Sequence, residues 1–314
     1  IDFPKRKILH TNLVENLRYG ENPHQMGALY SQNLKNNLKQ IHGKTLSYNN
    51  YSDIFAALTI SKSLPKNTGT VIIKHGNPCG VSALKDNLDS YKSALETDPL
   101  SAFGGIVSCN YKINQELALI LNKIFLEIVI ANGFDKKALK ILKLKKNLRL
   151  IDSSKISFNE VWKFNSADNF TLIQSEDKKV FSKKDFKIVS KRKPNRSQIN
   201  NLIFAFNVCR YTKSNAIILA SNKSTIGIGS GQTSRLDSCE IAIDKMNKFS
   251  RIKNEIVAAS DAFFPFVDGI EKLVQSGVSA IVQPSGSIRD REIIKFANET
   301  NTVLVFSKTR HFKH

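Results

Sequence analysis

Cysteine and histidine, the residues that most often bind transition metals, are scarce in this chain. Its 314 residues include six histidines and four cysteines, which are Cys79, Cys109, Cys209 and Cys239. No two cysteines stand at CxxC or another metal-binding spacing, and the histidines form no HExxH or Hx3–5H pattern. The sequence therefore predicts no transition-metal site, and it favours reduced thiols in the cytosol over a disulfide framework.

Long apolar runs are absent as well. The stretch KIFLEIVIANGF is shorter than the roughly 18 uncharged residues that a membrane helix needs, and it contains Glu127. The first ten residues, IDFPKRKILH, include neither the apolar segment of a signal peptide nor an initiator methionine. We therefore expect a cytoplasmic protein with no membrane partner, and we expect the natural protein to continue upstream of Ile1.

Acidic residues are few, since 27 Asp and Glu stand against 47 Lys and Arg, for a net charge of +20. Such a charge raises the alternative of a nucleic-acid-binding protein. The two densest basic stretches, 143–149 and 183–196, are not interleaved with stacking aromatics as RNA-binding surfaces are. We therefore expect no nucleic-acid partner, and a diffuse positive field that favours anionic small substrates.

Short apolar strands, turns of Gly, Pro or Ser and helical patterns alternate along the chain. Apolar strands that run into turns occur within 70–80, 224–234 and 279–288, a last strand occurs at 302–307, and helical spacing recurs at 82–98, 197–214, 235–249 and 289–301. This alternation predicts an α/β fold. The length suggests two domains, and a polar, lysine-rich linker near 151–200 divides them into a first unit at 1–190 and a second at 191–314.

The stretch TVIIKHGNPCG, residues 70–80, predicts a buried strand that ends at Lys74 and His75. We expect Gly76 through Gly80 to continue neither a strand nor a helix. Open α/β sheets bind ligands at such strand ends. A lysine beside a histidine can stabilise negative charge while the imidazole accepts a proton. The alternative is that the pair is only the solvated end of a strand.

Three other stretches combine turn-forming residues with reactive groups. LRYGENPHQ (17–25) offers Arg18 and Tyr19 to a phosphate, or is an ordinary surface turn. GIGSGQTSR (227–235) is glycine-rich but matches neither a Walker loop nor GxGxxG, which favours a turn that lines a ligand site. In SDAFFPFVDG (260–269), the phenylalanines either fill a core or bind a flat ligand between Asp261 and Asp268.

Eight motifs resemble, in order, one family: LRYGENPHQ, IKHGNPCG, DPLSAFGGIV, YTKSNAI, GIGSGQTSR, SDAFFPF, PSGSIRD and RHFKH. This is the AICAR transformylase half of the AICAR formyltransferase/IMP cyclohydrolase family. The resemblance implies two cytidine-deaminase-like α/β/α units without zinc, and a homodimer with active sites at the interface. It also implies that the IMP cyclohydrolase domain lies upstream and is absent from this chain. A deaminase is the alternative enzyme, which the missing zinc motifs disfavour.

The resemblance implies formyl transfer from the cosubstrate 10-formyltetrahydrofolate to the 5-amino group of AICAR, with His75 as general base and Lys74 as transition-state stabiliser. Lys74 and the Asn215 amide are the candidate donors to the oxyanion. The positions matched to AICAR binding are Arg18, Tyr19, Asn50, Gly104, Glu127, Phe263 and Arg310. The positions matched to folate binding are Arg235, Leu236, Asp268, Ser287 and Ile288. Two positions depart from the family: Glu127 replaces an Asp of some members, and Val267 replaces an Arg.

Overall fold

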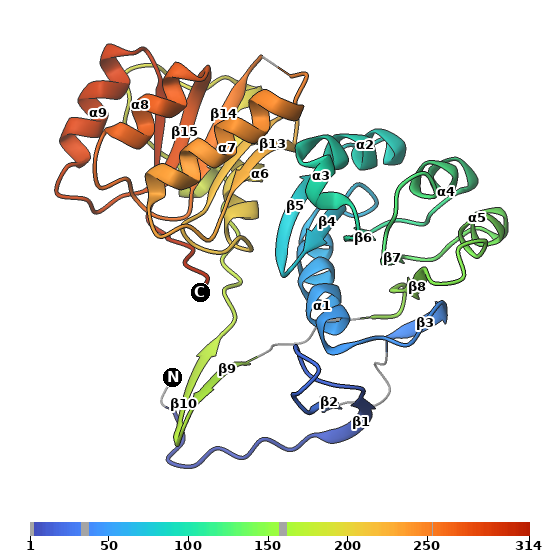
Figure 1. Cartoon of the computed structure of the whole chain (residues 1–314). Coiled ribbons are helices and arrows are strands. Elements are labelled where there is room, and N and C mark those ends of the chain that lie inside the picture. The colour runs from blue at the N-terminus through green and yellow to red at the C-terminus, as the bar shows by residue number, and fades with distance from the viewer. Residues whose placement is uncertain (1–2, 33–37, 157–161, 253) are drawn as a thin grey trace.

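A twelve-stranded mixed sheet forms the centre of the computed structural model, which describes residues 3–32, 38–156, 162–252 and 254–314 (Figure 1). From one edge to the other, the strands are β11 (Lys187–Ile188), β16 (Val303–Ser307), β15 (Val278–Pro284), β14 (Ile256–Ser260), β12 (Ile217–Ser221), β13 (Ser224–Gly229), β5 (Asn77–Ser82), β4 (Thr70–Lys74), β6 (Ile106–Cys109), β7 (Ile128–Ala131), β8 (Arg149–Asp152) and β3 (Lys39–His42). The α/β fold predicted from the sequence is therefore confirmed.

The same order of elements occurs twice along the chain. The first half runs from β3 through α1 (Tyr48–Ser63), the β4–β5 hairpin, α2 (Asn87–Thr97), α3 (Pro99–Ala102), β6, α4 (Gln115–Leu121), β7 and α5 (Lys136–Leu142) to β8. The second runs from β11 through α6 (Arg196–Cys209), the β12–β13 hairpin, α7 (Arg235–Phe249), β14, α8 (Asp268–Gln275), β15 and α9 (Asp290–Glu299) to β16. The exact domain boundary and the likeness to cytidine deaminase stay predictions.

The sheet is covered by helices on both faces. Alternate residues of β4 show this arrangement, because Val71 and Ile73 belong to the core cluster that contains α1 and α6, whereas Ile72 belongs to the cluster on the side of α2, α4 and α5. A third cluster joins α7, α8 and α9 to the strands of the second half. Because the first cluster includes strands from both halves, one continuous layer of apolar side chains packs between the sheet and helices α1 and α6.

The two halves meet at the centre of the sheet along a short polar seam. Only Ser82 of β5 and Ser224 of β13 are paired in register, and their hydroxyl oxygens lie 2.8 Å apart. Beside them, the Val81 amide donates to Thr225 Oγ1 over 2.9 Å. The seam thus joins the carboxyl end of β5 to the start of β13, next to the turn of the second hairpin.

The prediction that no strand continues through residues 76–80 is wrong. The chain turns at His75 and Gly76, whose φ angles are 52° and 73°, and returns at once as β5, with Lys74 facing Asn77. Positive φ at both central residues is what a two-residue type I′ hairpin needs. Gly80 is required within this strand because a β-carbon there would lie 1.8 Å from the Ala94 carbonyl oxygen of α2.

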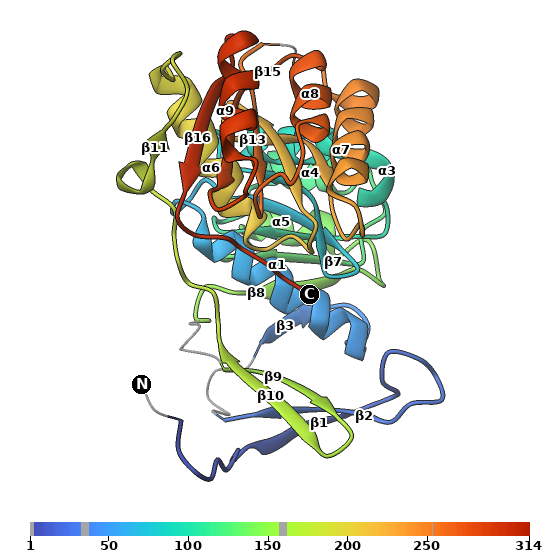
Figure 2. The same cartoon turned by 90° about the vertical axis from the view of Figure 1, so that its left-hand side faces the viewer.

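Two further hairpins lie at one end of the molecule, away from the large sheet (Figures 1 and 2). They are β1 (Asn12–Leu17) with β2 (Gly27–Ser31), and β9 (Trp162–Ala167) with β10 (Phe170–Ser175). The second hairpin and a short 3-10 turn (Lys183–Asp185) lie within the predicted irregular linker, so that prediction is wrong in part. Among the described helices, none combines the length and apolar character that crossing a membrane requires.

Candidate active site

Lys74 and His75 lie at the tip of the β4–β5 hairpin, where the strand ends as the sequence predicted. The Lys74 ammonium donates to the Phe103 carbonyl oxygen over 2.7 Å. A β-carbon at Gly104 would lie 3.9 Å from that nitrogen, so the glycine leaves space in front of it. The His75 side chain is exposed, and its backbone is left-handed at φ 52°, which costs a residue other than glycine roughly 1–2 kcal/mol. Both side chains can therefore approach one ligand.

Asp53 of α1 stabilises this turn by accepting hydrogen bonds from its backbone amides. Nothing in the sequence patterns assigned this role to Asp53. Its Oδ1 accepts a hydrogen bond from the Gly76 amide over 2.6 Å, and the His75 amide donates to the same carboxylate. Burial raises the pKa of Asp53, while these hydrogen bonds and the nearby His75 act in the opposite direction. The position of Asp53 as the one acidic residue in the α1 sequence is the only signal that could have pointed to it.

Asn50 and Glu127, which were predicted to share a pocket, are in direct contact. Asn50 is buried at the start of α1, where it forms a capping box with Ser47. Its Nδ2 donates to Glu127 Oε2 over 3.0 Å. The Glu127 side chain therefore reaches the side-chain amide of Asn50 in the first turn of α1.

Arg18 and Tyr19 lie in the loop between β1 and β2. The loop is closed by a hydrogen bond of 2.7 Å from the Gly20 amide to the Gln25 carbonyl oxygen. It reaches the start of α1 because Asn49 Nδ2 donates to the Glu21 carbonyl oxygen over 3.1 Å. The exposed Arg18 side chain is thus in the same region of the molecule as Asn50.

A cavity of about 580 Å³ in the second half gathers most of the remaining predicted residues. Its walls include four phenylalanines: Phe263 was a predicted site residue, Phe264 and Phe266 belong to the same sequence motif, and Phe312 was not singled out. The predicted residues that line it are Asn215, Arg235, Leu236, Phe263, Asp268 and Arg310. An apolar cavity with a few polar groups of both charges is typical of a site for a small organic ligand.

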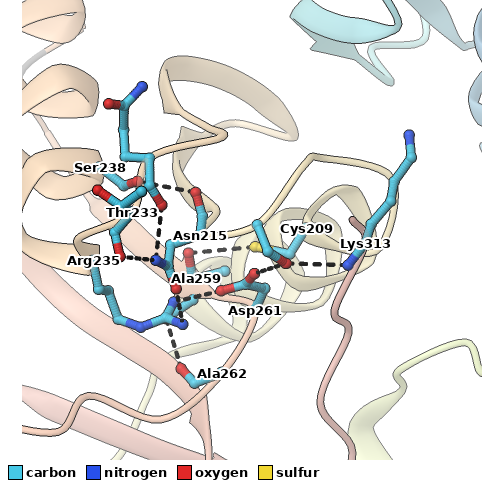
Figure 3. Close-up of polar contacts among 12 residues, drawn as sticks. Cys209, Asn215, Thr233, Arg235, Ser238, Ala259, Asp261, Ala262 and Lys313 are labelled. Carbon is cyan, nitrogen blue, oxygen red and sulfur yellow. Dashed lines mark hydrogen bonds and ion pairs between the residues drawn. The ribbon is translucent and has the colours of Figure 1, made fainter.

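Arg235 is buried at the base of this cavity and fixes its polar end (Figure 3). It forms an ion pair with the fully buried Asp261, and its guanidinium also donates to Ser260 Oγ over 2.8 Å and to Asn215 Oδ1 over 2.7 Å. Asp261 therefore neutralises Arg235 and does not face a ligand beside the phenylalanines. This corrects the interpretation of residues 260–269 in which a flat ligand lies between Asp261 and Asp268.

The Asn215 side chain is also fully engaged. Its Nδ2 donates to the carbonyl oxygens of Gln232 and Thr233 over 2.9 and 3.0 Å, while its Oδ1 accepts from Arg235 (Figure 3). To donate to an oxyanion, Asn215 would have to release one of these hydrogen bonds. Lys74, whose ammonium carries three protons, needs only one of them for Phe103.

One hydrogen bond connects the two groups of residues. The Lys213 amide donates to Asn77 Oδ1 over 3.2 Å. Asn77 follows His75 by two residues, and Lys213 precedes Asn215 by two. The hairpin tip therefore adjoins the segment that leads into the cavity.

Ser287 and Ile288 lie outside the walls of the cavity. They belong to the loop after β15, where Ile288 is fully exposed. This loop borders the cavity, because the Arg289 guanidinium lies 4.7 Å from the centre of the Phe266 ring. Val267, the other departure from the family, packs against the core of the second half.

Arg18 and Arg310, both predicted to bind the AICAR phosphate, are not joined by any contact among the described residues. The four cysteines are free and buried, as expected of reduced thiols. Across the described part of the chain, no three His, Cys, Asp or Glu residues are grouped so as to hold a metal ion.

Comparison with known proteins gives consistent matches. A family model described as the AICARFT/IMPCHase bienzyme matches residues 2–245. The chain is 43% identical over 321 residues to the bifunctional purine biosynthesis protein PurH of Acetivibrio thermocellus, covering 100% of this chain and 62% of that protein. The proteins of the same name from Aquifex aeolicus and Buchnera aphidicola are 42% and 44% identical, each over 99% of this chain. The chain spans about three fifths of the length of these curated relatives.

Proposed function

The chain belongs to the AICARFT/IMPCHase bienzyme family, and from this premise we propose that it transfers a formyl group from 10-formyltetrahydrofolate to the 5-amino group of AICAR. The products are FAICAR and tetrahydrofolate. The names of these relatives support a role in purine biosynthesis. The observation that carries the choice of reaction is the turn after β4, which presents the Lys74 ammonium and the exposed His75 imidazole at adjacent positions.

The proposed reaction makes specific demands on the site. The AICAR amine is a poor nucleophile because its lone pair is delocalised into the ring. Alignment of two bound molecules contributes up to roughly 7–11 kcal/mol to lowering the barrier. As the amine nitrogen attacks the formyl carbon, the carbonyl oxygen gains negative charge and the amine loses a proton. The C–N bond to the folate then breaks, and the folate nitrogen regains a proton. No change of oxidation state occurs, so no redox cofactor is involved.

Each step has a candidate residue. His75, exposed at the hairpin tip, accepts the amine proton and can return it to the folate nitrogen. Lys74 stabilises the oxyanion, since its ammonium retains protons beyond the one given to Phe103. Asn215 instead holds the polar wall of the cavity in place, because both of its amide protons and its Oδ1 are already bonded to protein groups.

The two ligands meet at the cavity, because the residues assigned to AICAR come from both groups and include Phe263 and Arg310 of the cavity wall. The AICAR ribonucleotide lies among Arg18, Tyr19, Asn50, Gly104, Glu127, Phe263 and Arg310. The folate occupies the aromatic cavity with Arg235, Leu236 and Asp268, and its far end reaches Ser287 and Ile288 at the rim.

We also propose that the enzyme is a homodimer whose active sites combine residues of two copies. Arg18 and Arg310 share no contact within the described chain, yet both are assigned to one phosphate. The β1–β2 and β9–β10 hairpins expose large apolar side chains: Leu13, Tyr30, Phe164, Phe170 and Leu172. A two-stranded hairpin is marginally stable in water by itself, so a second copy that covers these faces would stabilise both.

A direct assay tests the proposed reaction. The purified chain is mixed with AICAR and 10-formyltetrahydrofolate, and tetrahydrofolate is followed by its absorbance. We expect turnover that requires both substrates and is lost in a His75→Ala variant of unchanged melting temperature. Wild-type protein that binds neither substrate and forms no tetrahydrofolate would refute the assignment. We expect the same chain not to close FAICAR to IMP, and IMP formation above the uncatalysed rate would contradict this expectation.

A further inference from the structure

The turn that carries the proposed base is held by a carboxylate from another element. His75 and Gly76 both have left-handed backbones, and their two amides lie at the centre of the hairpin loop, where the β ladder offers them no partner. Asp53 of α1 supplies the missing acceptor to both amides. The carboxylate is half-buried, and the hydrogen bond to Gly76 is short at 2.6 Å.

We propose that Asp53 is a positioning residue for formyl transfer, which fixes the backbone of His75 and thereby the direction of its imidazole. The inference rests on the proposed function of His75. Asp53 need not touch either substrate to have this effect, because it acts on the backbone of the turn through its hydrogen bonds.

The choice of residue at position 75 shows why such a support is needed. Asparagine and glycine are the usual residues at these positions of a type I′ turn, because their left-handed conformations cost little. Histidine lacks this advantage, so the turn is held in place by interactions outside the hairpin. Two amide hydrogen bonds to one carboxylate are such an interaction, and charge makes them stronger than bonds to a neutral acceptor.

The same helix links this support to the rest of the proposed site. Asn50, one turn before Asp53, binds Glu127, and the Asn49 side chain binds the loop that carries Arg18 and Tyr19. The first turns of α1 therefore set the relative positions of the base and of the residues assigned to AICAR. A shift of about 1 Å at a reacting group can cost about 100-fold in rate.

The test compares Asp53→Ala with Asp53→Asn. Alanine removes the acceptor, whereas asparagine keeps one acceptor oxygen in the same place without the charge. We expect Asp53→Ala to lower kcat by roughly 100-fold with AICAR affinity changed less than about threefold, and Asp53→Asn to recover most of that loss. Asp86→Ala is the matched control, because Asp86 also accepts a backbone amide hydrogen bond, from Asp89 over 2.9 Å, at the start of α2.

Hydrogen exchange at the Gly76 amide provides a readout that does not depend on activity. We expect slow exchange in the wild type and in Asp53→Asn, and fast exchange in Asp53→Ala, with melting temperatures that match the Asp86→Ala control. The inference is overturned if Asp53→Ala keeps its kcat, or if it loses AICAR affinity as much as turnover. Equal losses of kcat in both variants would also overturn it, because then charge and not the held turn would matter. A protected Gly76 amide in a wild type that forms no tetrahydrofolate would instead refute the proposed function alone.

Discussion

At His75 the backbone adopts a conformation that histidine rarely takes. Asparagine in its place would keep the two-residue turn and the hydrogen bonds to Asp53, since asparagine tolerates the left-handed region. Histidine at position 75 therefore makes the turn less stable than asparagine would. Strained positions of this kind concentrate at functional sites, which agrees with a catalytic role for the imidazole.

The substitution His75→Asn separates these two properties. We expect the melting temperature to stay the same or rise, while kcat for formyl transfer falls by roughly 10²–10⁴-fold because the base is lost. Steady-state kinetics and calorimetric AICAR binding measure both effects. Near-normal turnover in this variant would mean that another residue is the base and that Lys74 and His75 are only the solvated end of a strand.

Arg310 is expected to act on one ligand only. It is exposed at the cavity, with its guanidinium 4.6 Å from the centre of the Phe312 ring. If it binds the AICAR phosphate, Arg310→Ala should weaken AICAR binding by about 1.5–3 kcal/mol and folate binding much less. Arg192→Ala is the control, since Arg192 is exposed and donates to the Asn301 carbonyl oxygen. Equal losses for both ligands would indicate a folding defect.

At the scale of elements, each half of the sheet depends on a glycine that lets a helix approach its hairpin. A β-carbon at Gly80 would lie 1.8 Å from the Ala94 carbonyl oxygen of α2, and one at Gly229 would lie 1.8 Å from the Ser238 carbonyl oxygen of α7. The two contacts occupy the same place in the repeated order of elements. Strand β5 can therefore run beneath α2 only without a side chain at residue 80.

The substitution Gly80→Ala should consequently destabilise the protein by at least about 1–3 kcal/mol, because backbone atoms must move apart. Denaturant unfolding measures the change. Gly133→Ala provides a comparison, since the nearest atom to a β-carbon there is Lys112 Cγ at 3.8 Å, and the cost arises only from its positive φ of 98°. Equal stability of the two variants would show that β5 and α2 can separate freely.

The elements that the sequence predicted correctly are those whose patterns are local. Helices α6 and α7 follow capping residues, α6, α7 and α9 carry apolar side chains at helical spacing, and β4, β13 and β16 are short apolar runs. Strand β5 was missed because Gly, Asn and Pro are turn residues, and only its pairing with β4 and the approach of α2 make it a strand. The β9–β10 hairpin was missed because its residues are almost all exposed.

At the scale of the whole molecule, one buried ion pair crosses between the halves. Asp98, next to α3, is 3% exposed and lies 2.8 Å from the Lys245 ammonium of α7. Burial would raise the pKa of Asp98, but the hydrogen bonds from Lys245 and Ser101 outweigh it and lower the pKa below the ordinary value. A lowered pKa means that the folded state gains stability above the unfolded pKa and loses it as the pH falls.

The substitution Asp98→Asn should cost about 1–3 kcal/mol near neutral pH, since Lys245 loses its buried partner. This difference from the wild type should shrink as the pH falls below about 4 and through the lowered pKa, where Asp98 becomes protonated. Thermal unfolding across pH measures it. The exposed pair of Lys272 and Glu240 is the control, and Glu240→Gln should cost much less than Asp98→Asn. A difference independent of pH would exclude a role for the Asp98 charge.

The proposed composite active site can be tested by mixing two impaired variants, His75→Ala and Arg310→Ala, at an AICAR concentration too low to saturate Arg310→Ala, so that each variant alone shows little activity. If each site combines the first half of one copy with the second half of the other, a mixed dimer has one intact site and one with both defects. After exchange of subunits, activity should return to roughly a quarter of the wild-type value. If each site lies within one chain, every site keeps one defect and no activity returns. A monomer in sedimentation runs would contradict the proposal independently.

The sequence by itself determined the α/β class, the end of β4 at Lys74 and the ordered motifs that place the chain in its family. These follow from apolar periodicity, from turn residues and from residue identity, all of which are local properties. Only the tertiary structure decided that Asp53 holds the His75 turn, that Asp261 neutralises Arg235, and that both protons of the Asn215 amide are engaged. Hydrogen bonds between residues 17 to 26 positions apart depend on how helices and strands pack, and no local pattern in the sequence records which donor meets which acceptor.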